Sequence, residues 1–270
     1  MTPASSVPAL HRELLDVAST IARSAGALLL DRLAGPRTVT VKSSPTDMVS
    51  EVDQAAEQLV VGLLRRRRPD DGVLGEEGAS VEGSSGLRWV IDPIDGTTNY
   101  LYRAAAFSVS IAVEDGEGSL AGVVYDPQRD ELFAASRGAG ATRNGAPIRC
   151  SAATDVAQSL LATGFSYDAA RRRRQAEAVA AVIDSIRDIR RSGSAAVDWC
   201  SLACGRVDAI VESGQQVWDF AAGALIAAEA GALVGDLRGG PPSTSMAYGA
   251  APGIFDALAD LLRRGGADTA

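Results

Sequence analysis

Apolar side chains recur every three or four positions in several long segments, and this spacing predicts amphipathic helices. The first segment covers residues 9–33 and ends near Gly35-Pro36, a pair that does not continue a helix. The second covers residues 50–68 and follows a polar turn at residues 43–47. Later helices are predicted over residues 171–187, 193–204, 218–230 and 254–264.

Shorter runs rich in β-branched residues alternate with these helices and predict strands. Between residues 107 and 142 the runs lie close together, with turns at Asp126-Pro127 and Arg137-Gly138, so we expect an antiparallel meander. After residue 151, strands and helices alternate as in layered α/β folds. The predicted strands are residues 38–42, 73–78, 89–91, 107–113, 120–125, 131–135, 139–142, 159–163, 188–191, 208–212 and 232–236.

The order of these elements predicts a chain built from two joined halves. Residues 1–150 are expected to form an antiparallel sheet with helices, and residues 151–270 a mixed sheet with helices. At 270 residues the chain is long enough for one compact unit of this kind. We expect the functional site to lie between the halves.

The predicted chemistry is concentrated in the stretch from Trp89 to Tyr100. A short apolar strand ends here in Asp92 and Asp95, and two carboxylates held this closely suit a hard cation. Gly96 and Thr97 follow at a place where a helix could begin, and free amides at a helix start bind anions such as phosphate. The stretch therefore predicts that a metal ion and a phosphate meet at one turn.

Three further acids lie where a strand or loop ends or a helix begins. Glu76 follows a short strand in Gly75-Glu76-Glu77, and Asp219 follows Trp218 at the start of an apolar helix. Asp53 lies in the first turn of the second helix, where a carboxylate also stabilises the helix dipole. Each acid alone is explained by a solvated loop or a helix start. Together with the two aspartates after Trp89 they favour a Mg²⁺ site.

Composition narrows the range of functions. The net charge is −8 and the pI is about 4.8, which argues against general binding of nucleic acid or anionic membranes. No apolar run approaches the roughly 18 residues needed to span a bilayer, and no signal peptide is evident, so we expect a cytoplasmic protein. The three cysteines are expected to be free thiols, and the single histidine, His11, is not expected to act as a general base.

Two runs of four arginines stand out against this acidic background. Residues 65–68 lie near a predicted helix end, and residues 171–174 lie at a predicted helix start. Without interleaved aromatic residues, a solvated face or local ion pairing is favoured over nucleic-acid binding. One of these arginines could still guide a phosphate toward the site.

In several blocks the sequence resembles the inositol monophosphatase family of Mg²⁺-dependent, lithium-sensitive phosphatases, in particular its bacterial SuhB-like branch. The most specific blocks are Asp92-Pro93-Ile94-Asp95-Gly96-Thr97 and Trp218-Asp219, which occur in this order about 120 residues apart. The other blocks are residues 42–47, 75–77, 191–196 and 228–231. The resemblance covers nearly the whole chain and implies an α/β (α+β) fold, a layered αβαβα sandwich, and commonly a homodimer.

The resemblance also implies a set of metal ligands. Glu76, Asp92 and the Ile94 carbonyl would hold a first Mg²⁺ ion, and Asp92, Asp95 and Asp219 would hold a second. Glu76 would share a third, weaker ion. The expected cofactor is therefore two to three Mg²⁺ ions per site, in surroundings that we expect to be partly solvated.

Catalytic roles implied by the resemblance belong to Asp53 and Thr97, which would orient the attacking water, and to Glu76. The Gly96 and Thr97 amides would bind phosphate. Glu212 would accept hydrogen bonds from a substrate hydroxyl. The residues expected at the substrate are Asp95, Gly96, Thr97, Gly193, Ser194, Ala195, Glu212 and Asp219.

The implied activity is hydrolysis of a phosphate monoester, with myo-inositol 1-phosphate as the leading substrate. Histidinol phosphate, fructose 1,6-bisphosphate and a 3′,5′-bisphosphate nucleotide would use the same metal site, and the fold does not choose among them. Departures from the family pattern at Arg103-Ala104-Ala105-Ala106, Thr142 and Ile210-Val211 concern the substrate rather than the metals. The alternative outside enzyme function is a non-catalytic regulatory role.

Overall fold

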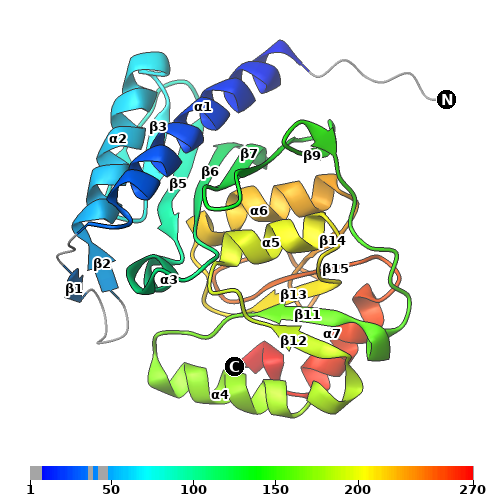
Figure 1. Cartoon of the computed structure of the whole chain (residues 1–270). Helices are drawn as coiled ribbons and strands as arrows, with labels where there is room; N and C mark the ends of the chain where they lie inside the picture. The colour runs from blue at the N-terminus through cyan, green and yellow to red at the C-terminus, as the bar shows by residue number, and fades with distance from the viewer. Residues whose placement is uncertain (1–7, 36–38, 42–47, 270) are drawn as a thin grey trace.

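The chain forms five stacked layers in which helices and sheets alternate (Figure 1). The structure is a computed structural model and describes residues 8–35, 39–41 and 48–269. Its helices are α1 (Ala9–Arg32), α2 (Glu51–Arg67), α3 (Thr97–Tyr102), α4 (Ala169–Ala180), α5 (Ala195–Ala203), α6 (Val217–Glu229) and α7 (Phe255–Arg264).

The first sheet has eight strands in the order β10-β9-β8-β7-β6-β5-β3-β4. All neighbouring strands are antiparallel except β3 and β5, so the expected antiparallel meander is confirmed with one parallel pair added. The strands are β3 (Gly72–Gly75), β4 (Ser80–Val81), β5 (Arg88–Asp95), β6 (Ser108–Asp115), β7 (Gly118–Asp126), β8 (Glu131–Ser136), β9 (Ala141–Arg143) and β10 (Ala146–Pro147). A separate antiparallel pair joins β1 (Val39–Val41) and β2 (Met48–Ser50).

The second sheet has five strands in the order β12-β11-β13-β15-β14 and is mixed, as expected. Strands β12, β11 and β13 run parallel, whereas β15 is antiparallel to both of its neighbours. The strands are β11 (Leu160–Thr163), β12 (Asp188–Arg190), β13 (Ala209–Glu212), β14 (Leu233–Gly235) and β15 (Ala247–Ala250).

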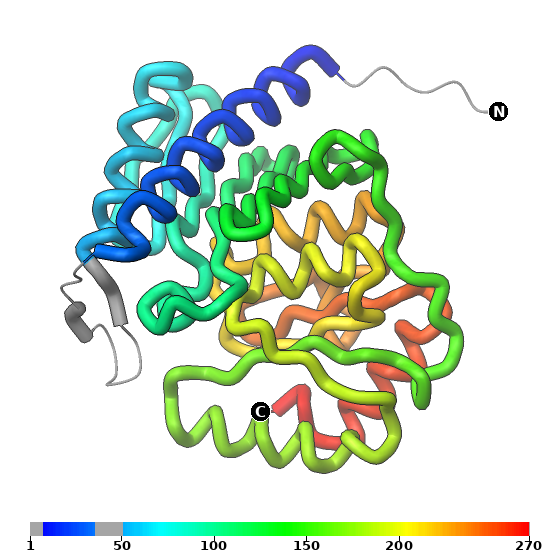
Figure 2. The backbone as a smooth tube through the Cα atoms, viewed as in Figure 1, coloured from blue at the N-terminus to red at the C-terminus, as the bar shows by residue number. Residues whose placement is uncertain are grey.

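Helices α1 and α2 cover the outer face of the first sheet, while α5 and α6 lie between the two sheets (Figures 1 and 2). Helices α4 and α7 cover the outer face of the second sheet. This arrangement confirms the expected layered αβαβα sandwich. It also explains why α6 is apolar around most of its circumference, since a helix between two sheets has little solvent-facing surface.

The structure differs from the sequence expectations at several elements: the strand expected over residues 73–78 ends at Gly75, and β2 and β4 were not expected. The helix expected over residues 171–187 ends at Ala180, and a 3₁₀ turn at Ile183–Ser185 follows, which places Val182 and Ile186 in the core. Strand β15 was not expected, because Ala-Tyr-Gly-Ala lacks β-branched residues and polar alternation. Both faces of β15 are buried, so the alternation typical of a half-exposed strand is absent. No helix within the described parts of the chain is long and apolar enough to cross a membrane.

A close backbone contact joins the first sheet to α6. A Cβ atom added to Gly122 in β7 would lie 2.9 Å from Ala222 Cα and 3.0 Å from Ala222 O. Because both atoms belong to the backbone of α6, the helix itself would have to move. The small residues at this crossing therefore set the distance between two layers.

We predict that Gly122→Ala lowers the free energy of unfolding by about 1–3 kcal/mol, the usual range for overpacking a core. Urea denaturation measures the change. Gly116→Ala is the matched control, since no atom lies within 4 Å of its added Cβ, and it should leave the midpoint nearly unchanged. Equal midpoints for the two variants would contradict the role of Gly122.

Candidate active site

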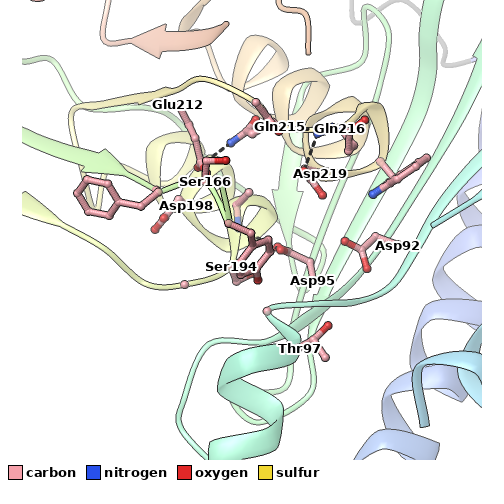
Figure 3. Close-up of a pocket in the computed structure, with 18 of the residues that line it drawn as sticks. Asp92, Asp95, Thr97, Ser166, Ser194, Asp198, Glu212, Gln215, Gln216 and Asp219 are labelled. Atoms are coloured by element: carbon pink, nitrogen blue, oxygen red, sulfur yellow. Dashed lines mark hydrogen bonds between the residues drawn. The ribbon is translucent and has the colours of Figure 1, made fainter. Parts of the chain in front are cut away.

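A cavity of about 490 Å³ lies where the end of β5 meets the beginnings of α5 and α6 (Figure 3). Its wall includes most of the residues that the sequence singled out, although these come from distant parts of the chain. The predicted site residues that line it are Glu76, Asp92, Ile94, Asp95, Gly96, Thr97, Gly193, Ser194, Ala195, Glu212 and Asp219.

Asp92 and Asp95 lie on the same side of β5 because the strand is irregular between them. In a regular strand, side chains three positions apart point to opposite faces. The pairing with β6 shifts register between these residues, and Asp92 Oδ1 accepts a 3.0 Å hydrogen bond from the Ile94 amide. A bulge of this kind redirects a side chain. Both carboxylates therefore reach the cavity.

Asp219 completes a three-carboxylate cluster from the first turn of α6. Its Oδ2 accepts a 2.7 Å hydrogen bond from the Gln216 amide, and this reciprocal cap fixes the side chain at the helix start. One carboxylate oxygen from each of Asp92, Asp95 and Asp219 lies within 4.8 Å of the others. The two acidic motifs of the sequence thus meet in space.

The carboxylates of this cluster share an unfavourable electrostatic environment. Burial raises the pKa of Asp92 well above its usual value, and the neighbouring charges of Glu76, Asp95 and Asp219 raise it further. Burial, followed by the charge of Asp95, also raises the pKa of Asp219 strongly. These directions show that burial and mutual repulsion both disfavour the ionised form of the cluster. A bound divalent cation would supply positive charge and favour the ionised forms.

Asp95 is held by the beginning of α5 rather than by solvent. Its Oδ2 accepts hydrogen bonds from Ser194 Oγ at 2.5 Å and from the Ala196 amide at 2.7 Å, while Oδ1 accepts from the Ala195 amide at 3.2 Å. Burial raises its pKa to about 6, and these three hydrogen bonds oppose the rise. The partly solvated surroundings expected for the cluster are therefore wrong at Asp95, because the α5 amides replace water.

Gly96 and Thr97 occupy the turn that follows. Gly96 has φ +94°, and a Cβ there would lie 2.9 Å from Ala106 O and 3.1 Å from Gly193 O, so glycine fits both the conformation and the space. Helix α3 begins at Thr97, as the sequence predicted. The turn therefore lies against Gly193 of the second half.

Thr97 is linked to Asp53 by a 3.0 Å hydrogen bond from Thr97 Oγ1 to Asp53 Oδ1. Both residues are buried, and Asp53 lies in the first turn of α2, so it retains its favourable position at a helix start. Thr97 Oγ1 also lies 3.1 Å from the Ile94 carbonyl oxygen. Because a hydroxyl has one proton, it donates to one of these acceptors at a time.

Glu76 lies in the turn after β3 and faces the cavity, but it is not one of the three carboxylates within 4.8 Å. The turn is held by Glu57 of α2, a residue to which the sequence gave no role. Glu57 Oε2 accepts from the Glu77 amide at 2.8 Å, and Oε1 accepts from the Ala79 amide at 2.9 Å. Since Asp53 and Glu57 are four residues apart, one face of α2 supports two parts of the site.

Glu212 lies at the end of β13 on the Ser166 side of the cavity (Figure 3). Gln215 Nε2 donates a 3.0 Å hydrogen bond to Glu212 Oε2, and Gln215 Oε1 in turn accepts from Trp199 Nε1 at 3.2 Å. Burial raises the pKa of Glu212 to about 7, although the Gln215 hydrogen bond and the charge of Arg191 act in the opposite direction. Gln215 therefore holds Glu212 in position, and the pKa of the Glu212 carboxyl group is close to neutral pH.

Two further polar residues of the site, Asp198 in α5 and Asn99 in α3, were given no role from the sequence. Asp198 lines the cavity, and burial raises its pKa to about 8. Its position four residues after Ser194 in a helix was the signal that could have placed it on the same face. Asn99 Nδ2 donates to Ala106 O at 2.7 Å and to Ser192 O at 2.8 Å, so it links α3 to the loop before α5.

Comparisons with known proteins agree with this geometry. The family model described as "Inositol monophosphatase family" matches residues 10–264. "Inositol-1-monophosphatase SuhB" of Mycobacterium tuberculosis is 41% identical, with 98% of this chain and 97% of the relative covered. "Nus factor SuhB" of Escherichia coli is also 41% identical, over 84% of this chain and 86% of the relative. The solved suhB structure from Bartonella henselae has a TM-score of 0.89 at 34% identity and covers 94% of this chain and 99% of that one.

We predict that Glu57→Gln loosens the turn that carries Glu76. An amide side chain offers one acceptor oxygen where the carboxylate offers two, so one of the two backbone amides loses its partner, at a cost of about 1–3 kcal/mol. Hydrogen exchange at Glu77 and Ala79 should accelerate.

Glu51→Gln on the same helix is the matched control, because Glu51 is exposed. It should leave exchange at both amides unchanged. Slow exchange in Glu57→Gln as well would show that other contacts hold the turn.

Proposed function

Because the chain belongs to the inositol monophosphatase family, we propose that this phosphatase hydrolyses myo-inositol 1-phosphate in the cavity at the end of β5. The observation that carries the proposal is the close approach of oxygens from Asp92, Asp95 and Asp219. Glu212, a carboxyl group suited to a hydroxyl-rich substrate, lines the same cavity. The relatives named for inositol-1-monophosphatase support the choice of substrate.

The donor set fits Mg²⁺, which prefers carboxylate and carbonyl oxygens. We place a first ion at Glu76, Asp92 and the Ile94 carbonyl, and a second at Asp92, Asp95 and Asp219, with Glu76 sharing a third. The Ile94 carbonyl can still serve when it accepts from Thr97, because a carbonyl oxygen has two lone pairs. When bound, the ions would lower the pKa of a bound water and neutralise charge on the phosphoryl group.

Asp53 and Thr97 would position the attacking water. When the Thr97 hydroxyl turns its proton to the Ile94 carbonyl, it no longer donates to Asp53 Oδ1, which would then accept a hydrogen bond from the attacking water. When Thr97 donates to Asp53, its oxygen lone pairs can accept a hydrogen bond from water. The pair thus provides acceptors beside the β5 turn, as general-base catalysis requires.

The substrate would extend from the turn toward Glu212. The Gly96 and Thr97 amides would bind phosphate oxygens, while Asp95 and Asp219 would approach the ester from the cluster. We place the polyol hydroxyls against Glu212. The backbone of Gly193, Ser194 and Ala195 would line the same part of the pocket.

Other properties of the family belong to the same proposal. We expect inhibition by millimolar Li⁺, a homodimer and a cytoplasmic location. Histidinol phosphate, fructose 1,6-bisphosphate and a 3′,5′-bisphosphate nucleotide are the alternative substrates. A regulatory role without catalysis is a further alternative. Two relatives are named Nus factor SuhB, so an activity assay should distinguish this role from catalysis.

The proposal is tested by measuring phosphate release from inositol 1-phosphate and from the three alternative substrates, with Mg²⁺ and after removal of Mg²⁺ by a chelator. We expect Mg²⁺-dependent release that is fastest with inositol 1-phosphate. A complete lack of release from a broad panel of phosphate monoesters would favour the regulatory alternative.

Asp95→Asn should lower kcat/KM by at least about 100-fold, because it removes charge from the cluster itself and not from a supporting residue. Since Asp95 also accepts three hydrogen bonds from α5, its unfolding midpoint must be measured alongside. Ser194→Ala serves as the control: it removes one of these hydrogen bonds but keeps the carboxylate charge. A variant Asp95→Asn that folds and retains full activity would refute the assignment.

Glu212→Gln should change substrate preference by about 10-fold, because a pocket that bonds substrate hydroxyls discriminates among their positions. The Mg²⁺ concentration for half-maximal activity should stay close to that of the unchanged protein. If Mg²⁺ dependence shifts while the substrate ranking stays fixed, Glu212 acts on the metals and not on the polyol.

A further inference from the structure

A buried chain of hydrogen bonds links α5 to the carboxyl group of Glu212. Trp199 Nε1 donates to Gln215 Oε1 at 3.2 Å, and Gln215 Nε2 donates to Glu212 Oε2 at 3.0 Å. Trp199 is fully buried and Gln215 is 2% exposed, so bulk water does not compete for these hydrogen bonds. Glu212 and Gln215 line the cavity (Figure 3), whereas Trp199 packs behind them in the core between the two sheets.

The indole ring of Trp199 is held in place by close packing against two glycines. A Cβ added to Gly223 of α6 would lie 2.5 Å from Trp199 Cβ, and a Cβ added to Gly249 of β15 would lie 2.6 Å from Trp199 Cζ3. Both distances are well below the 3.5–4.0 Å of an ordinary carbon–carbon contact, so a side chain at either position would displace Trp199. Packing therefore sets the direction of the indole N–H bond.

This N–H bond determines which end of the Gln215 amide faces Glu212. The indole nitrogen is a donor only, so it requires the amide oxygen of Gln215 on its own side. The NH₂ group of the same amide then points to Glu212, where Oε2 has to accept. Because Oε2 is occupied in this way, Oε1 is the carboxyl oxygen left for a substrate hydroxyl.

We propose that Trp199 and Gln215 are specificity-determining positioning residues, which keep Glu212 in the form that accepts a hydrogen bond and so select phosphate monoesters whose alcohol carries a further hydroxyl group. This inference rests on the proposed phosphatase function of the cavity. A hydroxyl that donates to a carboxylate forms a charge-assisted hydrogen bond. A site built to bond a substrate hydroxyl discriminates strongly against an analogue that lacks it.

The same hydrogen bonds affect the charge of Glu212. Burial raises its pKa to about 7, and the charge of Asp95 acts in the same direction. The Gln215 hydrogen bond and the charge of Arg191 lower the pKa of Glu212. Because an N–H donor stabilises the ionised form, Gln215 favours a carboxylate that accepts over a carboxylic acid that donates.

The test compares kcat/KM for myo-inositol 1-phosphate and cyclohexyl phosphate, which has the same ring without the hydroxyl groups, at one Mg²⁺ concentration. The unchanged protein should prefer inositol 1-phosphate. In Gln215→Leu the ratio of the two kcat/KM values should fall by about 10-fold, as expected for the loss of a hydrogen bond to a charged group. The fall should arise mainly from a higher KM for inositol 1-phosphate, while cyclohexyl phosphate is hydrolysed as before.

Trp199→Phe tests the first hydrogen bond of the chain, because it keeps an aromatic ring and removes the N–H donor. The Gln215 amide can then turn either way, so the ratio should fall by about 2- to 5-fold. Trp89→Phe is the matched control: Trp89 is also fully buried, and its Nε1 donates to Asp71 Oδ2 at 2.8 Å. Its ratio should equal that of the unchanged protein, and equal falls in the two tryptophan variants would overturn the proposal.

A titration of Glu212 provides a readout that does not depend on turnover. Carbon-13 NMR of protein labelled at the glutamate carboxyl carbons, with the signal assigned from Glu212→Gln, should show a higher pKa of Glu212 in Gln215→Leu than in the unchanged protein. Trp89→Phe should leave this pKa unchanged. An equal pKa of Glu212 in Gln215→Leu and the unchanged protein would contradict the positioning role.

Failure of this inference is distinguishable from failure of the proposed function. If Gln215→Leu hydrolyses both esters with the ratio of the unchanged protein, the positioning role is overturned and the phosphatase remains. If the unchanged protein hydrolyses neither ester, the proposed phosphatase and the selection of substrates both fail, and the titration still decides whether Gln215 controls the charge of Glu212.

Discussion

The hydrogen bonds between Asp95 and the beginning of α5 join the two halves of this protein at its site. One carboxylate at the end of β5 accepts from Ser194 Oγ and from the amides of Ala195 and Ala196, about 100 residues further along the chain. The amides at a helix start are unsatisfied within the helix and carry partial positive charge. The Asp95 carboxylate therefore accepts hydrogen bonds from amides that the helix leaves unpaired, and these hydrogen bonds partly stabilise its negative charge. The position of the cavity wall around Gly193 follows from this contact.

The ionised carboxylates of Asp92 and Asp219 are stabilised by fewer hydrogen bonds than that of Asp95. Asp95 therefore contributes to the stability of the fold, whereas the other two carboxylates need a bound cation. Burial and mutual repulsion raise the pKa values of both, whereas the α5 amides limit the rise at Asp95 to about 6. Buried like charges are costly unless they are protonated or neutralised by a cation. The fold holds the cluster in place through the bulge of β5 and the cap of α6. The cost of the arrangement is consistent with a site for a divalent ion.

Much of this site could be predicted because its polar residues lie in short blocks. The turn from Asp92 to Thr97 combines a strand end, a glycine with positive φ and a helix start, and the Trp218-Asp219 block marks another helix start. The order of periodic segments predicted alternating strands and helices, and the family resemblance implied the full αβαβα sandwich. Strand β15 escaped because a strand buried on both faces shows no alternation.

Other contributions depend on tertiary contacts, so the sequence indicated them only weakly or not at all. Glu57 belongs to an ordinary amphipathic helix until its carboxylate meets the Glu77 and Ala79 amides. In the sequence, Asp198 is one residue of a predicted helix and Arg171 is one residue of an arginine run. The packing of α5 and α4 brings the two side chains to the cavity. The partly solvated setting expected for Asp95 was wrong for the same reason.

The most direct measurement of the central claim is anomalous X-ray scattering from crystals equilibrated with Mn²⁺ in place of Mg²⁺. Manganese prefers the same oxygen ligands and is visible by its scattering. The account predicts anomalous peaks within coordination distance of the Asp92, Asp95 and Asp219 carboxylates. Manganese that supports phosphate release but produces no peak at these carboxylates would contradict it.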